Sequence, residues 1–369
     1  MPAITQDEVI DRLRNVQDPE LHRDIVSLDM VKGVDINDAT VRVKVELTTP
    51  ACPRKDEIGR DVEAAVRSLP GVEAVEIEWS ANVRPRGANG AAVGPDGKPL
   101  EAIPGVKHII AVGAGKGGVG KSTVSVLLAV GMRRAGARVG LMDADVYGPS
   151  IPTMMGIEGS KPSVEDGKMV PIEAAGVPVM SIGFMVERDK PLIWRGPMVH
   201  GVVKQFLDQV LWGELDYLIV DLPPGTGDVP LTLAQSIPMT GAVIVCTPQD
   251  VALIDARRAV RMFQQLNVGC LGIIENMSYY LCPKCGNRDE LFDHGGAAAA
   301  ARELDVPFLG EIPLNVAVRI SGDAGTPERV FTDTPDYVSE AIHKVVGNVA
   351  GQVSVAALSG APAPTLTVE

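Results

Sequence analysis

The chain has 369 residues, a length that suits two domains better than one. Hydrophobic residues make up 46% of it, enough for a substantial core, and the formal charge of −13 disfavours nonspecific binding to nucleic acid, which needs a basic surface. No apolar run approaches the roughly 20 residues that cross a bilayer, and residues 1–10 lack a signal-peptide pattern, so we expect no membrane association. Five cysteines disfavour a secreted disulfide scaffold and indicate a cytoplasmic protein.

A stretch rich in Gly and Pro, residues 85–105, divides the chain and is predicted to be a linker. Before it, residues 1–84 predict a small α+β domain, with helices near 6–16 and 55–68 and strands over 40–47 and 72–79. At the other end, residues 350–369 are rich in Ala, Ser, Gly and Pro and are predicted to form a disordered tail.

Residues 106–349 alternate short apolar runs with helical segments. The predicted strands are His108–Val112, Arg138–Met142, Val177–Ile182, Tyr217–Asp221, Ala242–Cys246, Cys270–Glu275 and Phe308–Ile312. They are apolar throughout rather than alternating, which is typical of parallel strands covered on both faces. The sequence therefore predicts an α/β domain with a doubly wound, mostly parallel sheet, whose ligands bind at the carboxyl ends of the strands.

Residues 115–122 read Gly-Lys-Gly-Gly-Val-Gly-Lys-Ser and lie between a predicted strand and a predicted helix over 121–134. In such a phosphate-binding loop, backbone N–H groups and one lysine hold the phosphates, and a hydroxyl binds Mg²⁺. Lys121 and Ser122 suit these roles. Lys116 is a second lysine, typical of nucleotidases that work as face-to-face dimers. The residues expected to contact the nucleotide are Gly115, Lys116, Gly117, Gly118, Val119, Gly120, Lys121, Ser122 and Thr123.

Polar residues also follow the next strands. Asp221 ends an apolar strand ahead of a Gly/Pro-rich loop, the Walker-B pattern that brings a carboxylate to Mg²⁺. Asp143 is predicted to contact the same ion and Asp145 to position the attacking water, although an aspartate at a strand end commonly caps a turn or helix. Asn276 follows a later strand, where its amide could read a base or simply close a turn.

Cys282 and Cys285 form the chain's single C-x-x-C. Two thiolates cannot complete a tetrahedral site alone, but a two-fold dimer would supply four. This favours a bridging 4Fe–4S cluster, with zinc or a redox dithiol as alternatives. Cys246 and Cys270 are predicted to be core residues. Cys52 lies between prolines ahead of a helix, and a helix N-terminus lowers the pKa of a thiol.

With these motifs, the C-terminal part resembles the deviant Walker-A ATPases, and among them the Mrp/ApbC iron–sulfur cluster carrier family. The segments that carry the resemblance are residues 115–123, 143–150, 194–198, 221–228, 247–249 and 282–285. The N-terminal part resembles the PaaD-like domain of iron–sulfur maturation factors, through Asp18-Pro19-Glu20 and residues 48–53.

The resemblance implies a homodimer that hydrolyses ATP with Mg²⁺ and transfers a 4Fe–4S cluster to apo iron–sulfur proteins, with scaffold proteins as further partners. It also implies that Lys116 reaches the partner's nucleotide, that Asn276 contacts adenine, and that Cys52 takes part in cluster exchange. Three alternatives remain at this point: a positioning switch on membrane or DNA, a zinc-bridged dimer, and an electron-transferring reductase. The reductase is disfavoured because its cluster cysteines lie far apart in sequence.

Overall fold

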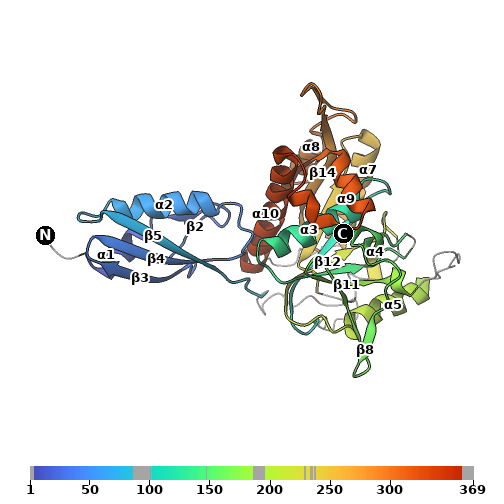
Figure 1. The fold of residues 1–369 in the computed structure, drawn as a ribbon, viewed down its shortest axis with the longest axis horizontal. Helices are drawn as coiled ribbons and strands as arrows, with labels where there is room; N and C mark the ends of the chain where they lie inside the picture. The colour runs from blue at the N-terminus through green and yellow to red at the C-terminus, as the bar shows by residue number, and fades with distance from the viewer. Residues whose placement is uncertain are drawn as a thin grey trace, which may run out of the picture.

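The structure, a computed structural model, describes residues 4–85, 100, 102–146, 148–185, 196–227, 230–232, 236 and 238–359. It contains a small N-terminal domain and a larger C-terminal domain (Figure 1). The predicted linker at 85–105 lies mostly outside the described residues, because 86–99 and 101 are not among them.

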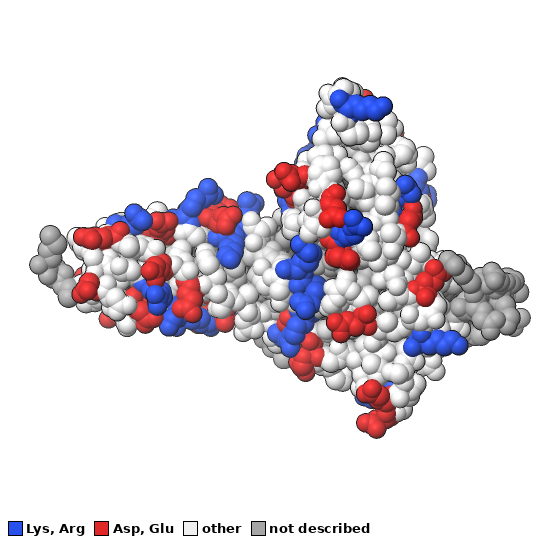
Figure 2. All heavy atoms as spheres, viewed as in Figure 1, with Lys and Arg blue, Asp and Glu red and all other residues white. Residues whose placement is uncertain are grey.

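The N-terminal domain packs two helices on a three-stranded sheet, which confirms the predicted α+β class. Its elements are α1 Gln6–Leu13, β1 Gln17–Asp18, β2 Arg23–Asp24, β3 Val31–Asn37, β4 Thr40–Leu47, α2 Lys55–Arg67 and β5 Ala74–Ala81. Strand β4 is central, antiparallel to β3 and parallel to β5. Its alternate residues Val41, Val43 and Val45 are buried, in one core with Ile58 and Val62 of α2. Figure 2 shows acidic and basic side chains intermixed over this domain.

The C-terminal domain is built on a mostly parallel sheet with the order β10-β11-β7-β12-β6-β13-β14-β15, and β16 pairs with β14. The strands are β6 Val106–Gly113, β7 Val139–Asp143, β10 Ile172–Ala174, β11 Val177–Ser181, β12 Leu215–Asp221, β13 Gly241–Cys246, β14 Cys270–Leu281, β15 Arg288–Asp289 and β16 Phe308–Leu314. The seven predicted strands all occur. Sequence reasoning missed the short antiparallel strands β10 and β15 and the separate hairpin β8 Ser163–Glu165 with β9 Lys168–Val170.

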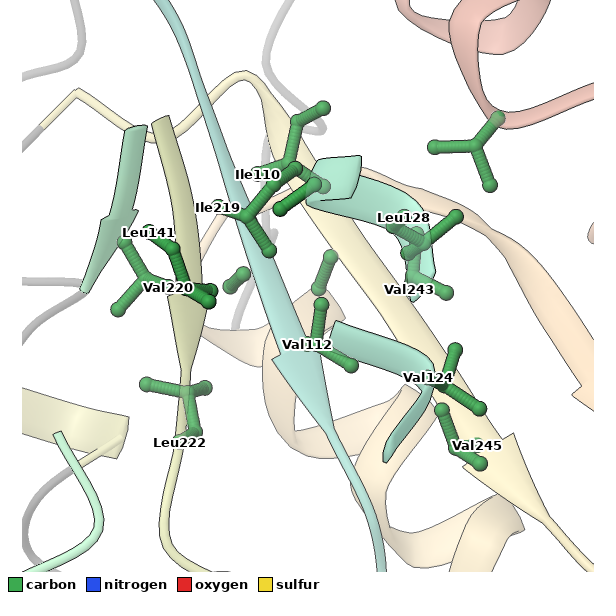
Figure 3. Close-up of a cluster of buried hydrophobic side chains, with 14 of the residues drawn as sticks. Ile110, Val112, Val124, Leu128, Leu141, Ile219, Val220, Leu222, Val243 and Val245 are labelled. Carbon is green, nitrogen blue, oxygen red and sulfur yellow. The ribbon is translucent and has the colours of Figure 1, made fainter. Parts of the chain in front are cut away.

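Helices cover the sheet and bury its apolar strands. They are α3 Lys121–Arg134, α4 Ile151–Met154, α5 Gly196–Asp208, α7 Asp250–Gln265, α8 Gly296–Glu303, α9 Val316–Asp323 and α10 Asp336–Ser359, with 3-10 turns at Ile182–Phe184 and Pro327–Phe331. Figure 3 shows part of this core, where Ile110 and Val112 of β6 gather with Val124 of α3, Ile219 of β12 and Val243 of β13. All five side chains are fully buried, as expected for a sheet covered on both faces.

Helix α10 corrects the predicted disordered tail. The helix continues to Ser359, so the prediction is wrong for residues 350–359, and residues 360–369 lie outside the described part. Val346, Val349, Ala350 and Val353 recur at helical spacing and are buried. The alanines that suggested a low-complexity tail instead favour the helix and pack against the domain.

The N-terminal domain meets the C-terminal domain beside α10 (Figure 1). The Tyr217 hydroxyl of β12 donates a 3.0 Å hydrogen bond to Oγ1 of Thr49, and both residues are fully buried. A Cβ atom at Gly347 of α10 would lie 2.8 Å from Cβ of Pro53, and one at Gly351 would overlap the Glu20 carboxylate. Glycine at these two helical positions therefore lets the residues 18–20 and 48–53 approach the helix closely.

Candidate functional site

The loop at residues 114–120 joins β6 to α3 at the carboxyl edge of the sheet. Gly118 and Gly120 both adopt φ of 82°, a backbone conformation that favours glycine. Gly120 caps α3, and the first turn of this helix holds no acidic residue. The backbone N–H groups at the start of α3 and the positive end of its helix dipole suit a phosphate group.

Lys121 lies inside a buried cluster of charged and hydroxyl groups. Its Nζ is 2.7 Å from Oδ2 of Asp221 and 3.8 Å from Oδ2 of Asp145, and it donates to Oγ of Ser122 at 3.2 Å. Asp221 also accepts hydrogen bonds of 2.6 Å from Ser122 and from Ser125. The structure thus brings together the lysine, the hydroxyl and the Walker-B carboxylate that the sequence predicted at one site.

Asp143 is adjacent to Asp221, because β7 and β12 pair in parallel with these two residues in register. One oxygen of Asp143 accepts a hydrogen bond from Oγ of Ser181 and the other accepts from the N–H of Asp145. Burial, together with the neighbouring Asp221 carboxylate, raises the pKa of Asp143 well above the usual aspartate range. Two buried carboxylates beside a hydroxyl form an oxygen-donor set that a hard divalent cation such as Mg²⁺ would stabilise. The residues present therefore fit the ion.

Asp145 lies two residues further along and is largely buried. Its Oδ1 accepts a 3.3 Å hydrogen bond from the N–H of Gly148, while its Oδ2 faces the Lys121 ammonium. This is the turn-closing geometry of the alternative interpretation, combined with proximity to Lys121. One carboxylate therefore closes the turn with one oxygen and faces Lys121 with the other.

Lys116 points to a different neighbour from Lys121. Its Nζ contacts Oε1 of Gln249 at 3.5 Å, and Thr247 donates to the same oxygen at 3.2 Å. Gly115 sits tightly against α7, since a Cβ there would overlap the backbone of Asp255. Lys116 is therefore at the edge of the loop, partly exposed, and outside the carboxylate cluster.

Asn276 lies at the end of the loop opposite Lys116. It is 6% exposed, and its Nδ2 donates a 2.8 Å hydrogen bond to the carbonyl oxygen of Val119. The amide also closes over Gly120, where no side chain would fit beside it. Asn276 thus stabilises the nucleotide loop through Nδ2, and its Oδ1 is a hydrogen-bond acceptor.

The C-x-x-C lies in a hairpin between β14 and β15, the loop at the top of Figure 1. Cys282 is half-buried and Cys285 exposed. The N–H of Gly286 donates to the carbonyl of Cys282 at 2.8 Å, and Gly286 has φ of 72°. Hydrogen bonds to the sulfur from the backbone N–H groups of Lys284 and Cys285 lower the pKa of Cys282. The hairpin is a knuckle that stabilises a thiolate, as a metal ligand requires, and does not open a helix as redox dithiols usually do.

Cys52 differs from the expectation that a helix N-terminus would lower its pKa. Burial in the N-terminal core, with the nearby Glu20 and Asp18 carboxylates, raises the pKa of Cys52 to about 11. Helix α2 begins three residues later, at Lys55, and the N–H of Arg54 offsets only part of this effect. Cys52 is therefore a protonated thiol at neutral pH. Cys246 and Cys270 are buried and partly buried against the main core, as predicted.

Sequence reasoning missed three polar partners of the site. Ser125 follows Lys121 by one helical turn and bonds to Asp221, a spacing that could have been found. Ser181 ends β11, and its contact with Asp143 depends on β11 pairing with β7. Gln249 belongs to the Thr-Pro-Gln motif that the resemblance used without assigning it a role. Trp194 and Arg195, from another of those motifs, lie outside the described residues.

No helix in the described ranges is long and apolar enough to cross a bilayer. Comparison with family models matches residues 105–350 to the ParA family, described as the NUBPL iron-transfer P-loop NTPase. Residues 6–79 match the iron–sulfur cluster assembly protein family.

Relatives named iron–sulfur cluster carrier protein align over nearly the whole chain. The protein from Synechocystis is 48% identical over 364 residues, covering 96% of this chain and 99% of its own. That from Deinococcus radiodurans is 50% identical over 357 residues, covering 96% and 98%. That from Escherichia coli is 40% identical over 339 residues, covering 92% and 90%.

Among solved structures, a nucleotide-binding protein from Archaeoglobus fulgidus in complex with ADP is 43% identical, with a TM-score of 0.57, covering 64% of this chain and 92% of that one. The cell division ATPase MinD of Pyrococcus furiosus is 22% identical, with a TM-score of 0.50 over 66% of this chain and 98% of that one, and shows the shared fold. The chain belongs to the family of NUBPL-type iron-transfer P-loop NTPases and carries at its N-terminus a domain of the iron–sulfur cluster assembly family.

Proposed function

We propose that this chain is a cytoplasmic, ATP-hydrolysing carrier that binds a labile 4Fe–4S cluster between two copies and transfers it to apo-proteins. The observation that carries the proposal is that one domain combines a complete phosphate-binding loop with an exposed knuckle whose Cys282 thiolate is stabilised by backbone N–H groups. The carrier names of the relatives and the ADP held by the Archaeoglobus protein support the same assignment.

In the nucleotide site, Gly115 to Thr123 surround the phosphates and Lys121 turns from Asp221 to them. Ser122, Asp143 and Asp221 would hold Mg²⁺, which neutralises charge on the β- and γ-phosphates. Asp145 would orient the attacking water, because its carboxylate is 3.8 Å from the Lys121 ammonium and can accept a hydrogen bond from the O–H of that water. Oδ1 of Asn276 would accept from the amino group of adenine.

Lys116 would act on the nucleotide of a second copy. Within its own chain it contacts Gln249 and lies apart from the carboxylate cluster around Lys121. Helix α7 begins directly after Gln249, and in its first turns Val251 is 65% exposed and Ile254 is 48% exposed. Apolar side chains at the rim of a nucleotide loop suit an isologous contact between copies. Such a contact would bring a second positive charge to the phosphates, as an arginine finger does.

The same two-fold axis would let two knuckles share one cluster. Each copy offers Cys282 and Cys285 at an exposed turn, and four thiolates are the usual ligand set of a 4Fe–4S cluster. Zinc also accepts four thiolates, so it is the competing outcome at this site.

Reconstitution tests the proposal directly. The full-length protein, incubated with iron and sulfide without oxygen, is expected to develop a broad visible charge-transfer absorption and to pass its iron to an apo iron–sulfur protein. Cys282→Ala should abolish the absorption, whereas the matched change Cys270→Ala, at a partly buried core cysteine, should leave it. Zinc without iron, or absorption that survives in Cys282→Ala, would refute the cluster assignment.

A further inference from the structure

Two consecutive residues of β14, Glu275 and Asn276, bind two different parts of the molecule. Asn276 donates its 2.8 Å hydrogen bond to Val119, inside the nucleotide loop and 157 residues away. Glu275 faces the segment that carries the cysteine knuckle. One short piece of strand therefore touches both the phosphate-binding loop and the base of the cluster-binding hairpin.

Glu275 joins the two ends of that segment. Its Oε1 accepts hydrogen bonds from Oγ of Ser278 at 2.6 Å and from the N–H of Gly295 at 3.1 Å. Its Oε2 accepts from the N–H of Ala297 at 2.8 Å, in the first turn of α8. Ser278 precedes the knuckle and Gly295 follows it, and the carboxylate between them is fully buried. A buried carboxylate with these donors is costly to disturb, so it fixes the base of the hairpin.

Met277, which lies between Asn276 and Ser278, is held in a strained backbone conformation. Met277 has φ of 55°, in the left-handed region that non-glycine residues rarely adopt. The pairing of β14 with β16 shifts register between Asn276 and Tyr280, so the strand is irregular here. The Met277 side chain also reaches the nucleotide loop, since its Cε is 3.5 Å from the Cβ position of Gly120. Strain of this kind costs on the order of 1–3 kcal/mol and persists only where surrounding contacts impose it.

We propose that Glu275 is a positioning residue that couples the nucleotide loop to the cysteine knuckle. Phosphate binding reshapes the loop at Val119 and Gly120, which moves Asn276 and Met277. Because Glu275 precedes them directly and holds Ser278 and Gly295, the shift is passed to the base of the hairpin and changes the setting of Cys282 and Cys285. This inference rests on the proposed function, because it assumes ADP at the loop and the cluster at the knuckle.

The test measures how ADP changes the reactivity of Cys282 in the full-length, metal-free protein. The rate of iodoacetamide alkylation at Cys282 is followed by mass spectrometry with and without saturating ADP, and ADP affinity is measured on the same samples. In the wild type the two rates are expected to differ by at least about fivefold, the lower range of measured site-to-site coupling. In Glu275→Gln and in Ser278→Ala, the rates of Cys282 alkylation with and without ADP should become equal, while ADP still binds.

The matched control is Ser354→Ala, which removes another buried serine hydroxyl, bonded within α10 to Ala350. This change should leave the ADP effect at its wild-type size. Ser278→Ala loses a single hydrogen bond, so it carries the test if Glu275→Gln fails to fold. Equal rates in the wild type despite ADP binding, or a full ADP effect in both variants, would overturn the coupling and leave the carrier function standing. Absence of ADP binding would overturn both.

Discussion

The buried ammonium of Lys121 lies 2.7 Å from the buried carboxylate of Asp221. The same carboxylate oxygen accepts the hydroxyl of Ser122, so the lysine expected to bind phosphate and the carboxylate expected to bind Mg²⁺ are paired with each other.

Alanine substitutions of the two lysines of the loop are expected to have different effects on nucleotide binding and hydrolysis. Lys121→Ala removes the cis phosphate contact and leaves Asp221 without its cation, so nucleotide binding and hydrolysis should both be lost. Lys116→Ala should keep nucleotide binding and lower the hydrolysis rate by about 10³-fold or more, the effect of removing an arginine finger. Titration calorimetry and phosphate release separate the two quantities. A loss of binding in Lys116→Ala in proportion to activity would make Lys116 an ordinary cis ligand.

The contact between the domains should weaken as pH rises. Burial and the neighbouring Asp18 raise the pKa of Glu20 from 4.5 to about 7, partly opposed by Arg54. The folded chain therefore prefers the protonated acid, and stability falls as pH rises from 4.5 through about 7. Glu20→Gln should remove this loss, worth on the order of 1 kcal/mol after allowing for solvent screening at a partly exposed group.

Melting temperatures between pH 5 and 8 check the Glu20 prediction. The variant should gain over the wild type only towards the upper end, while Glu73→Gln, at an exposed position, should follow the wild type throughout. A constant offset at every pH would show that Glu20 stays ionised in the contact.

Gly347 is expected to control access to Cys52. A Cβ there meets Pro53 at 2.8 Å and the Ala51 carbonyl at 3.2 Å, so Gly347→Ala should push the residues 48–53 away from α10. Alkylation of Cys52, followed by mass spectrometry, should accelerate. The control is Gly322→Ala in α9, where an added Cβ meets nothing within 4 Å. An unchanged Cys52 rate in Gly347→Ala would mean that α10 does not shield the thiol.

The cysteines should react in an order set by their surroundings. The pKa of Cys282 is lowered by backbone N–H groups, whereas burial raises the pKa of Cys52 to about 11 and that of Cys246 to about 12. Since the thiolate is the nucleophile, limited iodoacetamide at pH 8 should label Cys282 well before Cys52. Labelling of Cys52 before Cys282 would contradict the raised pKa of Cys52 and the lowered pKa of Cys282.

Much of the fold and site could be predicted because the signals are local. The glycines and Lys121 define the loop within eight residues, and Asp143 and Asp221 meet because carboxyl ends of parallel strands share one edge. The contact of Ser181 with Asp143 could not be foreseen, since it depends on which strand lies beside β7. Burial of the loop around Cys52 raises the pKa of this thiol. This effect outweighs the lowering expected from the nearby helix N-terminus, which is the only one of the two that can be recognised in the sequence. In α10, alanine content suggested disorder although the valines keep helical spacing.

The proposed carrier function depends on two copies of the chain holding one 4Fe–4S cluster through Cys282 and Cys285. Native mass spectrometry of the reconstituted full-length protein, kept without oxygen, measures this directly. We expect a species of two chains with one 4Fe–4S cluster, absent in Cys282→Ala and in Cys285→Ala and retained in Cys52→Ala. A cluster on a single chain, a zinc-only dimer, or a cluster-bearing dimer that survives in both knuckle variants would contradict it.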